Sequence, residues 1–208
     1  MPGTFGKLLA WRGDFMRIMN VKRAIIIFLV IGTLAVVAGC ARWPEGPEPE
    51  PGETEYQLEI TVEVAGIIDS SDGMYYIVMD ADGNSATGPG YDILFWDDRF
   101  YYIKLEDGFF DFAQVQDDFE SIFDGGNFSG DNIQVTIALS DIGDPNSIDI
   151  NVVTTDSENN TYDYLDSYFT INTVLGSTVT REDSADDLEN GEADFDITKV
   201  TAEITTLY

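Results

Sequence analysis

Three kinds of residue in this chain are candidates for a reactive or ligand-binding role: one cysteine, many carboxylates and a group of clustered aromatic side chains. Cys40 is the only cysteine among 208 residues, and the sequence contains no histidine. Without histidine the chain cannot form a Ser-His-Asp triad, a Cys-His dyad, or a His-ligated zinc or haem site. We therefore expect neither zinc nor haem, and the remaining chemistry has to use carboxylates, tyrosines, a few lysines or bound calcium.

Cys40 ends a segment that has the features of a secretory signal. A basic pair at 22–23 precedes an uninterrupted apolar run over 24–37, which is followed by small residues. The run is shorter than the about 20 apolar residues that a membrane-spanning helix needs. The tetrapeptide Val-Ala-Gly-Cys at 37–40 resembles the bacterial lipobox. This resemblance implies cleavage between Gly39 and Cys40, acylation of Cys40, and export to a membrane anchor, with the inner or outer membrane left open.

The cysteine also divides the chain into predicted parts. Residues 1–18 fit a signal peptide poorly, and we interpret them as an over-extension of the reading frame, with the start at Met19 or Met16. Residues 19–39 are the predicted signal peptide. Residues 40–55 hold the lipidated cysteine and a linker rich in proline and glutamate, which favours an extended, stiff tether. Residues 56–208 are the predicted folded domain.

The charge of the chain limits its partners. The sequence has 39 acidic and 10 basic residues and a formal net charge of −29. Such a charge repels nucleic acid and anionic lipid headgroups, so we expect no nucleic-acid partner and attachment to the bilayer through lipid alone. Two explanations of the acidity stay open, a solvated surface and an affinity for cations such as calcium.

Hydrophobicity after the linker alternates with a period of two, which is typical of half-buried strands. Glycine, proline and Asx turns separate the runs, and this spacing predicts an all-β domain, a single antiparallel β-sandwich with jelly-roll or immunoglobulin-like topology. One or two helical turns are expected over 112–122. The predicted strands lie at 57–64, 74–79, 91–96, 100–105, 109–115, 133–139, 148–154, 162–164, 168–174 and 196–205.

The turn after the second predicted strand has the start of a calcium loop. Asp80, Asp82 and Asn84 have the spacing of an EF-hand, but positions six and twelve hold Ser85 and Tyr91 where that loop needs glycine and glutamate. The pattern favours a β-turn in which these side chains bond their own backbone. A looser calcium site that uses Asp80, Asp82, Asn84 and Asp92 stays open.

Several short passages resemble the DOMON-like sandwiches, which include the family 9 carbohydrate-binding modules. They lie at 75–84 (YYIVMDADGN), 87–88, 91–93, 137–143 (IALSDIG) and 148–152. The resemblance implies a sandwich that often has structural calcium, often binds sugars and in some branches binds haem. This chain departs from the haem branch because it has no histidine for an axial ligand. It also has one tryptophan in the predicted domain, where sugar binders commonly use two aromatic platforms.

That tryptophan begins the predicted ligand site. Trp96 is followed by Asp97, Asp98 and Arg99, with Tyr101 nearby, so an aromatic face has hydrogen-bonding groups beside it. A sugar ring needs this combination. The alternative is that Trp96 packs in the core, because adjacent aromatics on a strand point to opposite faces.

Three functions follow from these patterns. The first is an exported lipoprotein with a non-catalytic β-sandwich that binds polysaccharide, with calcium as a candidate ligand. The second is an assembly subunit that binds other envelope proteins through a sheet face or edge. The third is a glycoside hydrolase that uses two carboxylates.

Overall fold

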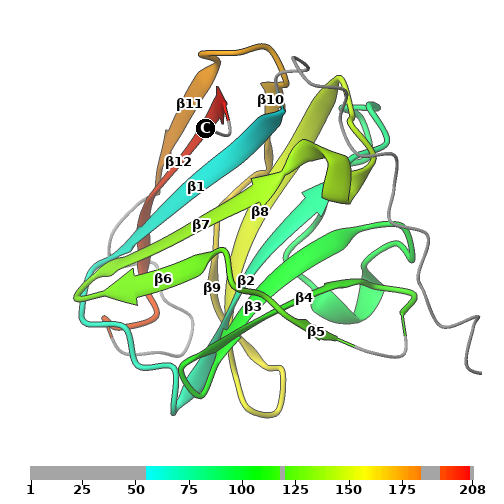
Figure 1. Cartoon of the computed structure of the whole chain (residues 1–208). Helices are drawn as coiled ribbons and strands as arrows, with labels where there is room; N and C mark the ends of the chain where they lie inside the picture. The colour runs from blue at the N-terminus through cyan, green and yellow to red at the C-terminus, as the bar shows by residue number, and fades with distance from the viewer. Residues whose placement is uncertain (1–54, 118–119, 184–192, 207–208) are drawn as a thin grey trace, which may run out of the picture. The chain divides into compact units, whose positions relative to one another are not determined.

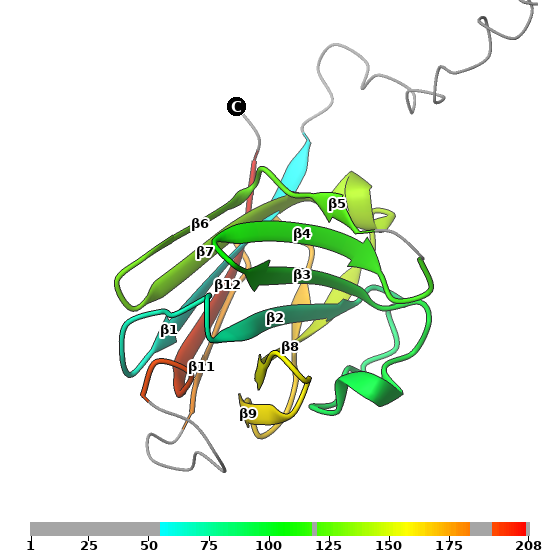
Figure 2. The same ribbon diagram turned by 90° about the horizontal axis from the view of Figure 1, so that it is seen from below.

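The computed structural model of the chain describes residues 55–117, 120–183 and 193–206. These residues form two antiparallel sheets that pack face to face, so the predicted β-sandwich is confirmed (Figure 1 and Figure 2). The five-stranded sheet has the order β11-β12-β1-β7-β6. Its strands are β1 (Tyr56–Val64), β6 (Gly126–Ser129), β7 (Asn132–Ala138), β11 (Thr178–Glu182) and β12 (Ile197–Thr206).

The seven-stranded sheet has the order β10-β8-β2-β3-β4-β5, and β9 also pairs with β8. Along the chain, β2 to β5 follow one another in this sheet before the chain crosses to β6. Two short 3₁₀ helices are η1 (Ile93–Phe95) and η2 (Leu139–Ile142). The strands are β2 (Gly73–Asp80), β3 (Tyr101–Glu106), β4 (Phe109–Gln114), β5 (Ser121–Ile122), β8 (Ser147–Asp156), β9 (Thr161–Tyr164) and β10 (Phe169–Asn172).

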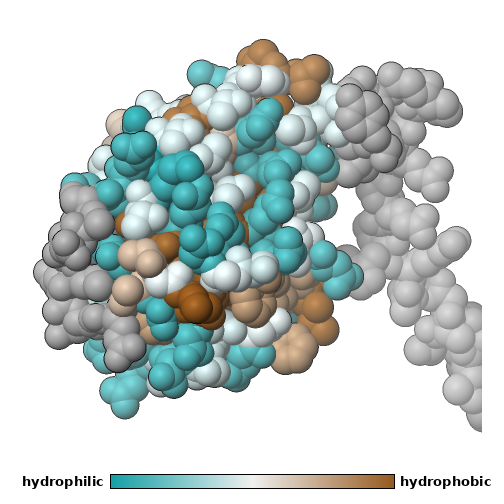
Figure 3. Space-filling view, turned by 90° about the vertical axis from the view of Figure 1, so that its left-hand side faces the viewer, coloured by the Kyte–Doolittle hydropathy of each residue, from teal (hydrophilic) through white to brown (hydrophobic). Residues whose placement is uncertain are grey.

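The five-stranded sheet has one buried face and one polar face. Along β1, residues 58, 60, 62 and 64 are buried against the other sheet, while the residues between them are polar. One row across the outer face joins Thr180, Thr201, Thr61 and Gln134 in register. Figure 3 views this side of the molecule and shows mostly hydrophilic side chains, with hydrophobic ones in small groups. The apolar and polar residues therefore alternate because one face of this sheet packs in the core and the other faces solvent.

The seven-stranded sheet differs because a long loop covers its outer face. The β2–β3 loop (residues 81–100) folds back over β2 and β8, and every residue of β2 is buried. Met74, Tyr76 and Val153 form a second apolar cluster on this outer face, against which the loop's Ile93 and Trp96 pack. Strands buried on both faces have near-continuous apolar sequences, which explains the weak alternation of β2. β8 is also buried on both faces but keeps an alternating sequence, because its outer face buries polar residues such as Asp149 and Asn151.

Two local predictions are wrong. Residues 91–96 do not form a strand, because the Asp92 carboxylate accepts a hydrogen bond from the Leu94 amide (3.1 Å) and begins η1. The helical turns expected within 112–122 are replaced by strands, with Phe112 in β4 and Ile122 in β5. The apolar spacing in that stretch comes from two strands and their connection.

The sequence also gave no sign of three strands, β5, β6 and β11. In β6, Gly126 lies where the two sheets approach each other, and a Cβ atom at this position would stand 2.4 Å from the Phe110 ring. The glycine that suggested a turn is thus needed for close packing at the start of a strand. The exposed, largely polar sequence of β11 gave no hydrophobic pattern.

Candidate functional site

The predicted calcium residues are largely engaged with their own backbone. Asp80 Oδ1 accepts the Asp82 amide (3.0 Å), Asp82 Oδ1 accepts the Asn84 amide (2.7 Å), and Asp92 caps η1. These are the Asx turns that the sequence favoured. Within 55–117, 120–183 and 193–206, no group of three or more carboxylates lies close enough together to hold a metal ion. The calcium site stays a prediction.

Asp80 has a second carboxylate beside it that the sequence did not suggest. Asp80 on β2 lies opposite Asp149 on β8, and each side chain is only 3% exposed. Asp149 accepts a hydrogen bond from Thr170, whereas Oδ2 of Asp80 is buried without a hydrogen-bond partner. Burial, together with the charges of Asp82 and Asp149, raises the pKa of Asp80 above its ordinary value.

Trp96 fastens the β2–β3 loop to the sheet. Its indole is half-buried, lies edge-on to Tyr76 with ring centroids 5.6 Å apart, and lies 6.3 Å from Tyr102. The indole N–H donates to the Gly90 carbonyl (2.8 Å). Burial raises the pKa of Tyr76 to about 12, so this phenol stays neutral beneath the loop. Trp96 therefore has a structural anchoring role, and its polar group already has a partner.

Of the other residues of the predicted ligand site, three are exposed in the turn after Trp96 and one, Tyr101, lies on the opposite face of the sheet. Asp97 and Arg99 are exposed and pair with each other, with Nε 2.9 Å from Oδ1. Asp98 is exposed in the same turn. Tyr101 packs on the core side of the sheet, where it stacks on Phe112 with centroids 5.9 Å apart. Trp96 and Tyr101 thus lie on opposite faces of the seven-stranded sheet.

A pocket of about 180 Å³ lies between the β2–β3 loop and the segment that joins β9 to β10. We call it the tyrosine pocket. The rings of Tyr91 and Tyr164 stack with centroids 4.4 Å apart and planes 21° from parallel. The aromatic and polar residues in its described lining are Tyr91, Asn151, Tyr164, Asp166, Ser167 and Tyr168.

Hydrogen bonds hold the loop in place at this pocket. The buried Asn151 donates from Nδ2 to the Pro89 carbonyl (3.0 Å), and the Tyr168 hydroxyl donates to the Ser85 carbonyl (3.0 Å). Gly88 lets the loop approach Tyr168, since a Cβ there would stand 2.5 Å from the ring. These contacts fix the position of the loop segment that forms one side of the pocket.

The sequence did not identify this pocket, although it contained a signal. Residues 162–168 read Tyr-Asp-Tyr-Leu-Asp-Ser-Tyr, a dense mixture of tyrosine and polar side chains. The sequence pattern predicts strands at 162–164 and 168–174 and only a connection between them. The contact of this run with Tyr91, more than 70 positions earlier, depends on how the loop folds over the sheet.

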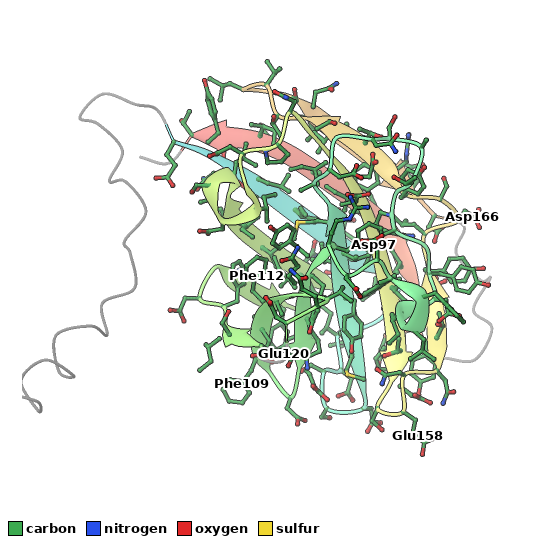
Figure 4. The ribbon with its side chains drawn as sticks, turned by 90° about the vertical axis from the view of Figure 1, so that its right-hand side faces the viewer. Asp97, Phe109, Phe112, Glu120, Glu158 and Asp166 are labelled. Atoms are coloured by element: carbon green, nitrogen blue, oxygen red, sulfur yellow. The ribbon has the colours of Figure 1, made fainter. Side chains whose placement is uncertain are left out.

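A charged cluster occupies another part of the outer face. Lys104 on β3 is 8% exposed, and its Nζ lies 2.8 Å from Glu120, 3.0 Å from Glu106 and 3.9 Å from Asp111. Tyr102 also donates to Glu120 (2.9 Å). Figure 4 shows Glu120 well separated from Asp166. The carboxylates here are bound to one lysine on a sheet face, so the arrangement is an ion-pair network.

The lipobox residues lie outside the described part of the chain. Gly39, Cys40 and the linker are among residues 1–54, so cleavage and acylation stay predictions. Among the residues that the structure describes, no helix has the length and apolar character needed to cross a bilayer.

No protein-family model, curated protein or solved structure matches the chain. The resemblances to lipoprotein signals and to DOMON-like sandwiches therefore stay predictions. The antiparallel sandwich itself is shown by the sheet order and register.

Proposed function

We propose that this chain is an exported, lipid-anchored protein whose β-sandwich binds carbohydrate and does not catalyse a reaction. The observation that carries the proposal is the tyrosine pocket. Aromatic rings offer flat apolar faces, and the carboxylate and hydroxyl groups of Asp166, Ser167 and Tyr91 offer partners for sugar hydroxyls. Its volume of about 180 Å³ is below the roughly 300–1,000 Å³ of pockets for drug-sized ligands. It suits one ring of a longer saccharide.

The composition of the pocket favours binding over hydrolysis. Glycoside hydrolysis with two carboxylates needs a pair about 5–10 Å apart. Asp166 is the one carboxylate in the described lining of the tyrosine pocket. The acidic side chains around Lys104 are tied into ion pairs on the sheet face.

Replacing Tyr91 by alanine tests the site directly. Tyr91 is 50% exposed and stacks on Tyr164, so its loss should weaken saccharide binding by about tenfold, or about 1.4 kcal/mol, with little change in stability. A glycan array with the full chain in detergent identifies ligands, and calorimetry measures their affinity. Phe109→Ala is the matched control, because Phe109 is 70% exposed on β4, away from the pocket. An array without binders, or equal losses in both variants, contradicts the proposal.

The lipid anchor has a separate test. Cys40→Ser removes the thiol that would carry lipid, and we expect the variant to leave the membrane fraction or to remain unprocessed. Cell fractionation and the mass of the mature amino terminus measure this. A variant that stays membrane-bound and is trimmed at residue 40 would rule out acylation as the anchor.

A second candidate function rests on the tip of the β2–β3 loop. Leu94 and Phe95 are adjacent and 77% and 83% exposed. Exposed neighbouring apolar side chains often mark contacts with other proteins. This observation favours an envelope assembly subunit, and Phe95→Ser would weaken such a contact without affecting the tyrosine pocket.

A further inference from the structure

We infer that the saccharide unit held in the tyrosine pocket carries a protonated amine, so that the preferred ligand is an amino sugar. The inference rests on the proposed carbohydrate function and specifies its ligand class. The aromatic rings and hydroxyl groups of the pocket suit neutral, anionic and cationic sugars alike. The charges around the pocket distinguish between these three classes.

The residues that line the pocket combine aromatic rings with a carboxylate. Tyr91, Tyr164 and Tyr168 contribute three aromatic rings to one small pocket, and Asp166 contributes a carboxylate. A cation within about 6 Å of an aromatic ring centroid is attracted by the ring, and the attraction is stronger when the cation is desolvated. A neutral hydroxyl can also donate to the Asp166 carboxylate, but only an ammonium group adds the attraction between two opposite charges. An amine therefore gains a charge–charge attraction and a cation–π contact that a hydroxyl at the same place does not.

The positively charged side chains of the described residues lie away from the pocket. The described residues include four cationic side chains, and each has a partner elsewhere. Arg99 pairs with Asp97, Lys104 with Glu120, and Lys199 with Glu63, while Arg181 lies over the Phe169 ring. None of the four belongs to the described lining of the pocket.

The net negative charge of the whole chain also favours a cationic ligand. With a formal net charge of −29 the protein attracts cations and repels anions over distances comparable to the Debye length, about 10 Å at 0.1 M salt. Uronic acids and sulfated sugars would be repelled by this charge and by the exposed carboxylate of Asp166 in the pocket lining. A positively charged sugar meets a favourable field on approach and a carboxylate on arrival.

Three β-1,4-linked tetramers that differ at one position test the inference. The tetramers of glucosamine, N-acetylglucosamine and glucose carry an amine, an acetamide and a hydroxyl at C2. We expect calorimetry on the full chain in detergent, at low salt and mildly acidic pH, to show at least tenfold tighter binding of the glucosamine tetramer. Asp166→Asn should remove most of this preference, because the amide keeps a hydrogen-bonding group for sugar hydroxyls but loses the negative charge.

Glu158→Gln separates a specific site from attraction to a polyanion. Glu158 is exposed and lies outside the pocket lining, so this variant loses the same charge as Asp166→Asn at a different place (Figure 4). Equal losses in the two variants would overturn the inference. So would equal affinities for the three tetramers, which would leave carbohydrate binding intact. Absence of binding to every saccharide would instead overturn the proposed function itself.

Discussion

Replacing Lys104 by methionine should lower the free energy of unfolding by about 3 kcal/mol. Removing one partner of a buried ion pair costs about 3–5 kcal/mol, and the value here lies at the lower end because Glu106 and Glu120 are more than a third exposed. Without the ammonium, the carboxylates of Glu106, Asp111 and Glu120 repel one another on the sheet face. Urea unfolding followed by circular dichroism at neutral pH measures the loss.

The pH dependence of this loss identifies its cause. Burial disfavours the ammonium, but hydrogen bonds to Glu120 and Glu106 outweigh that effect and raise the pKa of Lys104. A raised lysine pKa means that the stabilisation is fully present below the ordinary value of about 10.4 and is lost as the pH rises through the folded-state pKa.

The chain offers a matched control in Lys199. This lysine is also on a strand and pairs with Glu63, but both side chains are 36% exposed. Lys199→Met should therefore cost no more than about 1 kcal/mol, the usual upper value for a surface pair. Equal losses at the two lysines would mean that the Lys104 cluster has no special contribution to stability.

Strands with a clear apolar pattern could be predicted, both those with one solvent-exposed face, such as β1, and those buried on both faces, such as β2. In β1 the alternation of apolar and polar residues gives the strand and its buried face, and the register with β7 and β12 continues the pattern. The β2–β3 loop is an exception, because its apolar residues do not form a strand. Ile93, Leu94 and Phe95 look like strand residues, but they form a 3₁₀ helix, and the last two face solvent.

The tyrosine pocket could not be predicted because its residues meet only through tertiary structure. Tyr91 reaches Tyr164 after the loop has folded over β2 and β8, and the pocket depends on the Asn151–Pro89 hydrogen bond. In the sequence, Trp96 is a candidate ligand-binding residue because tryptophan next to charged residues is a common binding pattern. In the structure this indole holds the loop that carries Tyr91.

Trp96→Ala should therefore affect stability and ligand binding together. Loss of a large aromatic side chain costs about 3–5 kcal/mol when it is buried, and we expect about 2–3 kcal/mol for this half-buried indole. Releasing the β2–β3 loop also displaces Pro89, Gly90 and Tyr91, so the tyrosine pocket should lose its ligand. Urea unfolding, calorimetry with the saccharide, and limited proteolysis within residues 81–100 measure the three consequences.

Two further variants show whether Trp96 acts through the loop. Trp96→Phe keeps a ring against Tyr76 and removes the hydrogen bond to Gly90, so it should cost only about 0.5–1.5 kcal/mol and retain most of the binding. Tyr91→Ala should show the opposite combination, weak binding with nearly unchanged stability. If Trp96→Ala bound saccharide normally and resisted proteolysis within the loop, the anchoring role would be wrong. The pocket would then be held by Asn151 and Tyr168, whose hydrogen bonds to Pro89 and Ser85 bind the same loop without the indole.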